Sequence, residues 1–187
     1  MPDMKKRTSL VVCLFIVSCL FSFGKIGDWV LYNSKVGNYK ILMPSMPKEE
    51  SMKLTSAFGE LTMYFASLES EGTDDNILYQ CAFSEYPTEK INSNMNKEGL
   101  DNFFNGAADA SAKKMNGKVT TITESKYKEY PGRYAVIALN FDGEDYIALQ
   151  KLILVKNRFF MLQTFTKPSK AENNNAKKFF ESFDLYQ

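Results

Sequence analysis

Histidine is absent from all 187 residues, and only 3 residues are cysteine, so the side chains that most often carry acid–base and metal chemistry are scarce. A catalytic triad of Ser or Cys with His is excluded, because no imidazole is present to act as the general base. Zinc, copper and iron sites are excluded as well, since they take three or four His or Cys ligands. We therefore expect no cofactor, and we assign no residue to catalysis or to cofactor or metal binding.

The chain also lacks an excess of charge of either sign, with 23 basic and 22 acidic residues. Nucleic acid is not an expected partner, because phosphate binding takes a cationic surface. No G-x-G-x-x-G or G-x-x-x-x-G-K motif occurs, so a nucleotide enzyme is not expected either. Hydrophobic residues make up 44% of the chain, with 10 Gly and 6 Pro, a composition typical of an ordered globular domain.

The first 24 residues resemble a secretory leader. Lys5, Lys6 and Arg7 precede an apolar run over residues 10–23, and Ser22 and Gly24 place small residues at the third and first positions before the expected cleavage. This arrangement predicts a signal peptide over residues 1–24 and one secreted or periplasmic domain over residues 25–187. The run is shorter than the roughly 20 residues with which a helix spans a bilayer, so no transmembrane anchor is expected after processing.

Cys19 supports an alternative mode of processing. Residues 16–19 read Ile-Val-Ser-Cys, which also fits a lipobox, and Cys19 would then be acylated and become the new N-terminus. Apolar residues follow Cys19, whereas lipoproteins usually continue with a polar linker, so simple cleavage near Gly24 is favoured. With the leader removed, Cys81 is left without a disulfide partner, and its apolar surroundings over residues 77–83 predict a buried, inert thiol.

Apolar periodicity predicts a sheet-rich domain with two helices. Alternation with a period of two predicts strands over residues 38–43, 53–55, 59–68, 76–86, 118–127, 133–141, 146–155 and 158–166. The last four are separated by short turns, one of them Asp142–Gly143, so they form an antiparallel meander. Aromatic residues lie at or just before the start of this pattern, at Trp29, Tyr32 and Tyr39. Their rings either pack in the core as part of a first strand or form a surface that binds a partner.

The period changes to that of a helix in two segments. Residues 95–115 place Phe103 and Phe104 on one apolar face, with Ser93 or Asn94 expected as the cap and Gly117 as a left-handed exit. The chain ends in a second helix, for which Ser169 and Glu172 have capping-box spacing and Phe179, Phe180 and Phe183 form the buried stripe. The fold class is therefore α+β, an antiparallel sheet flanked by helices.

Four segments resemble the PsbP-like superfamily: YKILMPSMPKEE at residues 39–50, YPGR at 130–133, LILVKNRFFMLQTF at 152–165 and FFESF at 179–183. The resemblance extends from Trp29 to Leu185 and implies a PsbP-like α/β/α sandwich. The superfamily includes an extrinsic photosystem II subunit and a Ran-binding nuclear import factor, and its members act mostly as non-enzymatic binding or assembly subunits. Metal ligands in the plant branch include His, which this chain lacks, so the resemblance assigns no site.

The remaining residues offer few candidate reactive groups. Two S-x-x-K matches, Ser45 with Lys48 and Ser111 with Lys114, fit a Ser-Lys dyad only loosely, because prolines flank the first and the second lies at the wrong end of its helix. Acidic turns are the candidates for calcium, and scattered carboxylates are those for glycan hydrolysis. These residues are Glu69, Glu71, Asp74 and Asp75 in one turn, Asp142, Glu144 and Asp145 in another, and Glu60, Glu124 and Glu129 elsewhere.

Two hypotheses of different classes follow. The first is an exported, non-enzymatic binding or accessory module whose partner is another envelope protein or a small apolar ligand. The alternative is an envelope hydrolase that uses carboxylates or a Ser-Lys pair. A deep cleft in which several ionisable groups converge would favour the hydrolase.

Overall fold

The computed structural model describes residues 29–56, 58–70 and 72–186. These residues form ten β-strands, two α-helices and one turn of 3-10 helix. The predicted leader, residues 1–24 with Cys19, lies outside the described residues. No helix in these ranges is both long and apolar enough to cross a membrane.

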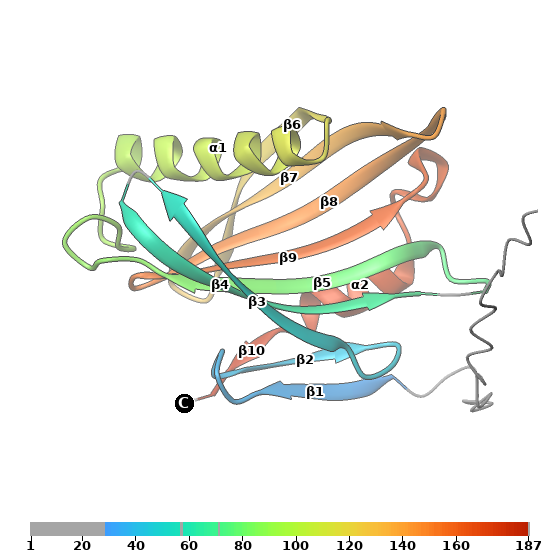
Figure 1. The fold of residues 1–187 in the computed structure, drawn as a ribbon, viewed down its shortest axis with the longest axis horizontal. Helices are drawn as coiled ribbons and strands as arrows, with labels where there is room; N and C mark the ends of the chain where they lie inside the picture. Colours follow the sequence, from blue (N-terminus) through green and yellow to red (C-terminus); the bar gives the residue numbers. More distant parts are fainter. Residues whose placement is uncertain (1–28, 57, 71, 187) are drawn as a thin grey trace, which may run out of the picture.

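The strands and helices follow one another along the chain as shown in Figure 1. The strands are β1 (Val30–Ser34), β2 (Tyr39–Met43), β3 (Lys48–Ser56), β4 (Gly59–Glu69), β5 (Asn76–Glu85), β6 (Lys118–Tyr127), β7 (Tyr130–Phe141), β8 (Glu144–Val155), β9 (Arg158–Thr166) and β10 (Asp184–Leu185). The helices are α1 (Lys97–Lys114), the 3-10 turn η1 (Pro168–Lys170) and α2 (Asn174–Glu181).

Seven strands form one antiparallel sheet in the order β3-β4-β5-β9-β8-β7-β6, and β1, β2 and β10 form a second, smaller sheet. The predicted meander is confirmed, because β6, β7, β8 and β9 pair in the order in which they occur along the chain. The Asp142–Gly143 turn between β7 and β8 has φ values of 51° and 80°, the positive angles that a tight hairpin needs. Pairing of β5 with β9 joins the two halves of the large sheet.

Helix α1 is confirmed, although its cap differs from the prediction. Asn96, and neither Ser93 nor Asn94, is the N-cap, and its side chain accepts a hydrogen bond of 2.8 Å from the backbone N–H of Gly99. Such a bond satisfies one of the N–H groups that a helix start leaves free. The buried side chains of α1 include Phe104, which has no exposed surface.

The exit from α1 also differs in its residue. Asn116 has the left-handed conformation, with φ of 52°, and Gly117 does not. Asn tolerates positive φ better than most residues, which explains the position of the turn. Gly117 is required for space instead, since a Cβ there would lie 2.7 Å from the carbonyl oxygen of Ala138 on β7.

The C-terminal helix begins later than predicted. Ser169 lies in η1, and Glu172 lies between η1 and α2, so the predicted capping box is wrong. Asn173 is the N-cap, and its Oδ1 accepts hydrogen bonds from the backbone N–H of Ala176 at 2.7 Å and from Nδ2 of Asn76 at 2.9 Å. The contact with Asn76, on a distant strand, therefore helps to set the start of α2, which local sequence spacing could not show.

Both faces of the large sheet are covered, and β8 shows the alternation. Leu152 and Leu154 pack with Phe104 of α1 on one face, whereas Ile153 packs with Phe179 of α2 on the other. Figure 1 shows α1 on one side of the sheet and the small sheet with α2 on the opposite side. The predicted antiparallel sheet with helices is confirmed. The full α/β/α sandwich is wrong, because the second face is covered largely by β1, β2 and β10 rather than by helices.

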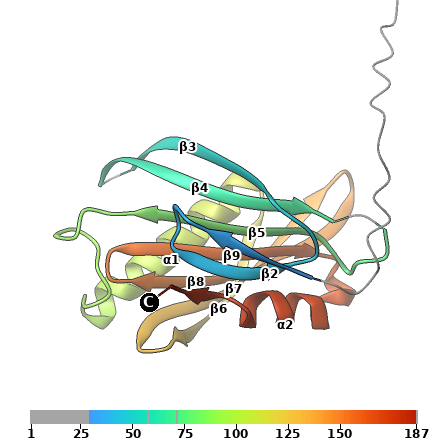
Figure 2. The same cartoon turned by 90° about the horizontal axis from the view of Figure 1, so that it is seen from below.

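Tyr39 lies at the centre of the second layer and is 1% exposed. Its ring is surrounded by those of Tyr32, Phe83, Phe160 and Phe183, with centroids 5.6 to 6.2 Å away. Most of these pairs meet edge to face, the arrangement that aromatic quadrupoles favour. The interpretation of Tyr32 and Tyr39 as packed rings is thus confirmed. Figure 2 shows β2 crossing over β5 and β9, with α2 beside it.

A row of polar side chains crosses the large sheet beneath α1. Ser67, Gln80, Gln163 and Gln150 occupy directly opposed positions on β4, β5, β9 and β8. Nε2 of Gln150 donates both to Oε1 of Gln163 and to the hydroxyl of Ser111 on α1. Gln150 is fully buried and Gln163 is 4% exposed, so these bonds replace water for groups that would otherwise be unpaired.

The C-terminal strand is fixed by Asp184. Its Oδ1 accepts hydrogen bonds from Tyr127 at 2.8 Å and Lys128 at 3.0 Å, and Oδ2 lies 3.5 Å from Nζ of Lys40. These contacts, led by the bond from Lys128, lower the pKa of Asp184 from 3.8 to about 2. Oη of Tyr127 also accepts a hydrogen bond from the backbone N–H of Leu185 at 3.0 Å, so β10 is attached to the rest of the fold through both its side chains and its backbone.

The losses of stability caused by replacing Gln163 and Gln150 should not be additive. Gln163→Leu or Gln150→Leu leaves a buried donor or acceptor without its partner, so each should lower the free energy of unfolding by about 1–3 kcal/mol. The double variant removes both groups and should cost less than the sum of the two. Urea unfolding of the four proteins measures this difference. Additive losses would contradict the coupling.

Acid should weaken the attachment of β10. Because the folded-state pKa of Asp184 lies below its ordinary value of 3.8, its ionised form stabilises the fold above that pH, and this contribution is lost as the pH falls towards about 2. Asp184→Asn should remove this part of the pH dependence, which falls roughly between pH 5 and 2. Near neutral pH it should lower the free energy of unfolding by only about 1 kcal/mol, because the carboxylate is partly exposed to solvent. Asp109→Asn, an exposed change on α1, is the control.

Candidate binding groove beside helix α2

The two S-x-x-K pairs do not form dyads. Ser45 lies in the bend between β2 and β3, and Lys48 begins β3, where its ammonium pairs with Glu50. Ser111 lies on the sheet side of α1 and receives the hydrogen bond from Gln150, whereas the exposed Lys114 extends towards Met52 of β3. In both pairs the lysine side chain is engaged elsewhere.

Four carboxylates of the acidic turns lie against neighbouring donors. In the turn before β5, Asp74 is bonded to three side chains and Asp75 pairs with Lys170 at 3.2 Å. Glu144 and Asp145, at the β7–β8 hairpin, contact Lys167 and Asn140. Within the described ranges, no three Asp, Glu, Cys or His residues are grouped so that they could hold a metal ion.

The scattered carboxylates stay apart as well. Glu60 pairs with Lys53 on the adjacent strand, and Glu124 pairs with Lys97 at the start of α1. Glu129 is exposed in the turn between β6 and β7. No pair among these three faces a common cleft.

Cys81 lies on β5 with no exposed surface and is a free thiol. Burial raises the pKa of Cys81 to about 12, so the thiolate that would act as a nucleophile is not formed near neutral pH. The predicted burial of this thiol is therefore confirmed, and its inertness stays a prediction.

A groove of about 520 Å³ lies between the η1–α2 segment and strands β7 and β8. This volume falls within the range of small-molecule binding sites. Side chains from all of these elements contribute to it. The lining residues are Tyr134, Leu149, Ala171, Glu172, Asn173, Asn174, Ala176, Lys177, Phe180 and Glu181.

The floor of this groove is apolar and aromatic. Leu149 and Phe180 are 4% and 8% exposed, and the rings of Tyr134 and Phe180 meet edge to face with centroids 6.0 Å apart. Burial, and secondarily the negative charge of Glu172, raise the pKa of Tyr134 above 10.0. The phenol thus stays neutral and is available as a hydrogen-bond donor.

The rim of the groove is polar. Lys177 and Glu181 lie 4.0 Å apart on the exposed side of α2. Behind Phe180, the half-buried Lys151 donates to the carbonyl oxygen of Phe180 at 3.5 Å, and burial lowers the pKa of Lys151 below 10.5. Glu172 makes no ion pair or side-chain hydrogen bond with any residue that the structure describes.

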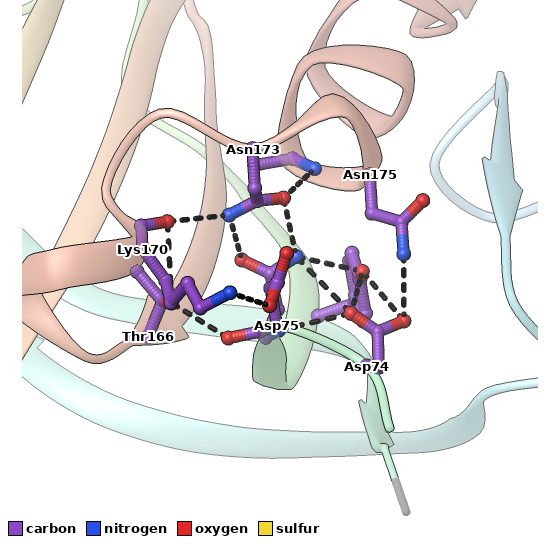
Figure 3. A network of polar contacts seen from close by, with 9 residues as sticks. Asp74, Asp75, Thr166, Lys170, Asn173 and Asn175 are labelled. Carbon is purple, nitrogen blue, oxygen red and sulfur yellow. Dashed lines mark hydrogen bonds and ion pairs between the residues drawn. The ribbon is translucent and has the colours of Figure 1, made fainter. Parts of the chain in front are cut away.

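A polar network fixes the end of the groove at the N-terminus of α2 (Figure 3). Tyr79 donates its hydroxyl proton to the carboxylate of Asp74, with both oxygens within 3.0 Å, and Asn175 donates to Oδ2 of Asp74 at 3.2 Å. Asn76, which is fully buried, exchanges side-chain hydrogen bonds with Asn173 at 2.9 and 3.1 Å. The turn before β5 is thereby joined to the first turn of α2.

A second set of contacts holds η1. The hydroxyl of Thr166 donates to the backbone carbonyl of Asp75 at 2.6 Å, and the side-chain amide of Asn173 donates to the carbonyl of Lys170 at 2.9 Å. Figure 3 shows these bonds alongside the Asp75–Lys170 ion pair. The acidic turn that the sequence suggested for calcium is thus tied to the wall of the groove by its own side chains and backbone.

The arrangement is suited to binding by shape and polar contact. Among the lining residues, the ionisable groups are Glu172, Glu181, Lys177 and Tyr134. None is a nucleophile beside a base, and the two carboxylates are on the rim rather than in the apolar floor. The groove therefore offers an aromatic surface, an unpaired carboxylate and amides.

Sequence reasoning missed this groove. Phe179, Phe180 and Phe183 were expected to insulate the sheet, and all three are buried. The position of Tyr134 opposite Phe180 depends on how α2 lies across β7 and β8, which local patterns do not determine. The one available signal was the run Glu172 to Asn175, polar residues immediately before an apolar stripe.

No family model and no curated protein sequence matches this chain. The solution structure of cyanobacterial PsbP (CyanoP) from Synechocystis sp. PCC 6803 has 14% identity, covers 89% of this chain and 99% of its own, and has a TM-score of 0.42. A crystal structure of a protein of unknown function, PA94 from Pseudomonas aeruginosa, has 12% identity, covers 76% of this chain and 85% of its own, and has a TM-score of 0.36. Neither likeness bears on the function of this chain.

Removal of the Asp74 carboxylate should destabilise the first turn of α2, which forms one end of the groove. Asp74→Ala leaves the buried Tyr79 hydroxyl and the backbone N–H of Asn76 without their acceptor, so the free energy of unfolding should fall by about 1–3 kcal/mol. Backbone amides of residues 174–177 should also exchange faster with solvent. Asp75→Ala is a matched control, because it breaks an exposed ion pair worth about 0–1 kcal/mol and keeps the backbone contact with Thr166. Equal effects of the two changes would contradict this role of Asp74.

Proposed function

We propose that this protein is an exported, non-enzymatic binding or accessory module of PsbP-like architecture. It binds a cell-envelope protein or a small apolar ligand in the groove beside α2, in a secreted or periplasmic location. The observation that carries the proposal is the groove itself, with its aromatic floor of Tyr134 and Phe180 and its polar rim.

Four observations support binding over hydrolysis. The hydroxyl of Ser111 is committed to Gln150, and the thiol of Cys81 is buried. The carboxylates that the sequence offered are engaged in ion pairs or lie apart. The resemblance of the sequence to the PsbP-like superfamily supports a binding role, because most of its members act as non-enzymatic binding or assembly subunits, and the predicted leader over residues 1–24 supports export.

A neutral apolar probe tests whether the groove binds ligands. N-phenyl-1-naphthylamine fluoresces when it leaves water, and we expect the full chain to bind it with ¹⁵N shifts at residues 171–181. Asn174→Trp places a large side chain on the rim and should weaken this binding at least tenfold, or about 1.4 kcal/mol. Asn105→Trp, the same change at an exposed site on α1, should leave it unchanged.

The hydrolase alternative has its own test. The full chain is assayed against ester, peptide and glycan substrates, and no turnover above background is expected. Turnover that is abolished by Ser111→Ala, or by replacement of a single acidic residue, would overturn the proposal.

In the probe experiment, binding of the naphthylamine that Asn174→Trp does not weaken would show that the groove is not the binding site.

A further inference from the structure

Strand β3 leaves one edge of the large sheet open. It is the outermost strand at that edge, as Figure 2 shows, and it pairs with β4 over all nine of its residues without a register shift. The N–H and C=O groups that point away from β4 are not bonded to any other backbone group that the structure describes. An unpaired edge of this kind is a template on which a further strand can add.

The other sheet edges are less suited to such pairing. Strand β6 has a shift of register between Val119 and Thr121, and its last residue, Tyr127, is bonded to Asp184 of β10. A bulge of this kind interrupts the row of backbone groups that a new strand would need. Strand β1, at the edge of the small sheet, has only five residues. The long, regular edge is therefore that of β3.

The side chains of β3 carry charges of both signs. The strand reads Lys-Glu-Glu-Ser-Met-Lys-Leu-Thr-Ser from Lys48 to Ser56, and seven of its nine residues are exposed. Charges on an edge strand oppose random pairing, because most registers bring like charges together or leave them unmatched. A register in which every opposed pair of charges is of unlike sign would escape this penalty.

Pairing of β3 with itself offers one such register. Two copies that meet edge to edge around a two-fold axis have antiparallel strands, with one residue opposite its own copy. Centring on Glu50 or Lys53 opposes like charges, and centring on Met52 brings no charges together. Centring on Ser51 places Glu49 opposite Lys53 of the second copy, and the symmetry repeats this contact. Opposite charges in directly opposed positions stabilise a strand pair.

The side chains that this register uses are accessible. Glu49 accepts a hydrogen bond of 2.7 Å from Tyr32 through Oε1 and makes no ion pair with the residues that the structure describes. Lys53 lies 2.9 Å from Glu60, in a pair whose side chains are 73% and 65% exposed and which is therefore held weakly. Glu49 and Lys53 are four residues apart, so they lie on the same face of the sheet.

The opposite face of the strand offers a second complementary contact. In the register centred on Ser51, Glu50 of the second copy lies opposite Met52. Nζ of Lys114, on α1, lies 3.9 Å from Sδ of Met52, and within the described ranges this ammonium makes no ion pair. Lys114 is thus placed to meet the carboxylate of Glu50 from the second copy.

We propose that β3 is a self-association surface, at which two copies of this chain pair antiparallel about Ser51 and share one continuous sheet. Glu49 and Lys53 pair across the axis on one face, and Lys114 pairs with Glu50 on the other. The groove beside α2 lies towards the opposite edge of the large sheet, on β7 and β8, so it stays open in such a dimer.

Charge reversal tests the proposal on the full chain. Sedimentation equilibrium measures the dissociation constant of the dimer, and circular dichroism verifies that the variants fold. Glu49→Lys and Lys53→Glu each oppose like charges twice and should weaken self-association by at least about tenfold. An equimolar mixture of the two variants should form a heterodimer with nearly the original affinity, because one chain then has two positive and the other two negative charges at these positions. Lys126→Glu, on the β6 edge, is the control and should have no effect.

Two further measurements locate the contact. Lys114→Gln should weaken self-association by about threefold, since it removes an exposed ion pair at two symmetric places. Backbone amides of β3 that point away from β4 should exchange more slowly with solvent as the protein concentration rises, whereas those of β6 should not change.

Each contrary result is decisive. A chain that stays monomeric at millimolar concentration would overturn the proposal, and so would self-association that neither charge reversal weakens. If both variants associate weakly but their mixture does not recover, the register about Ser51 is wrong. Binding of the naphthylamine probe is measured separately, so none of these outcomes decides the proposed function of the groove.

Discussion

The antiparallel pairing of β5 with β9 is the contact on which the rest of the structure depends. These two strands are separated along the chain by α1 and three further strands. Their pairing joins the antiparallel unit β3-β4-β5 to the unit β9-β8-β7-β6 in one sheet. Because the joined strands are apolar on both faces, each face has to be covered. Helix α1 covers one face, and the small sheet with α2 covers the other.

The two covering layers are held in different ways. Beneath α1, small residues such as Ala108 and Ala112 allow close approach, and the glutamine row supplies directional bonds between helix and sheet. On the opposite face, interlocking rings around Tyr39 dominate, and polar networks at Asp74 and Asp184 lie at the margins of this aromatic layer. The groove lies at such a margin, where the aromatic layer ends and polar anchoring begins.

Much of this fold could be predicted from the sequence. Alternation predicted the meander and most of the large-sheet strands correctly, because each strand has its own local pattern, but β3 begins at Lys48 and is longer than the predicted 53–55. The shortest elements were missed, since β10 has two residues and exists only through its pairing with Tyr39 and Lys40. The start of α2 was misplaced because it depends on Asn76, which is 97 residues from its partner Asn173. The groove was missed for the same reason, as it arises from how segments distant along the chain pack.

Strand β2 is paired on one side with β1, from near the start of the described chain, and on the other with β10, from its end. During synthesis, the ribosome releases β1 and β2 first and β10 last. The nascent chain therefore leaves β2 without its pairing partner at Tyr39 and Lys40 until the last residues emerge. A chaperone that shields this hairpin would act over almost the whole period of translation.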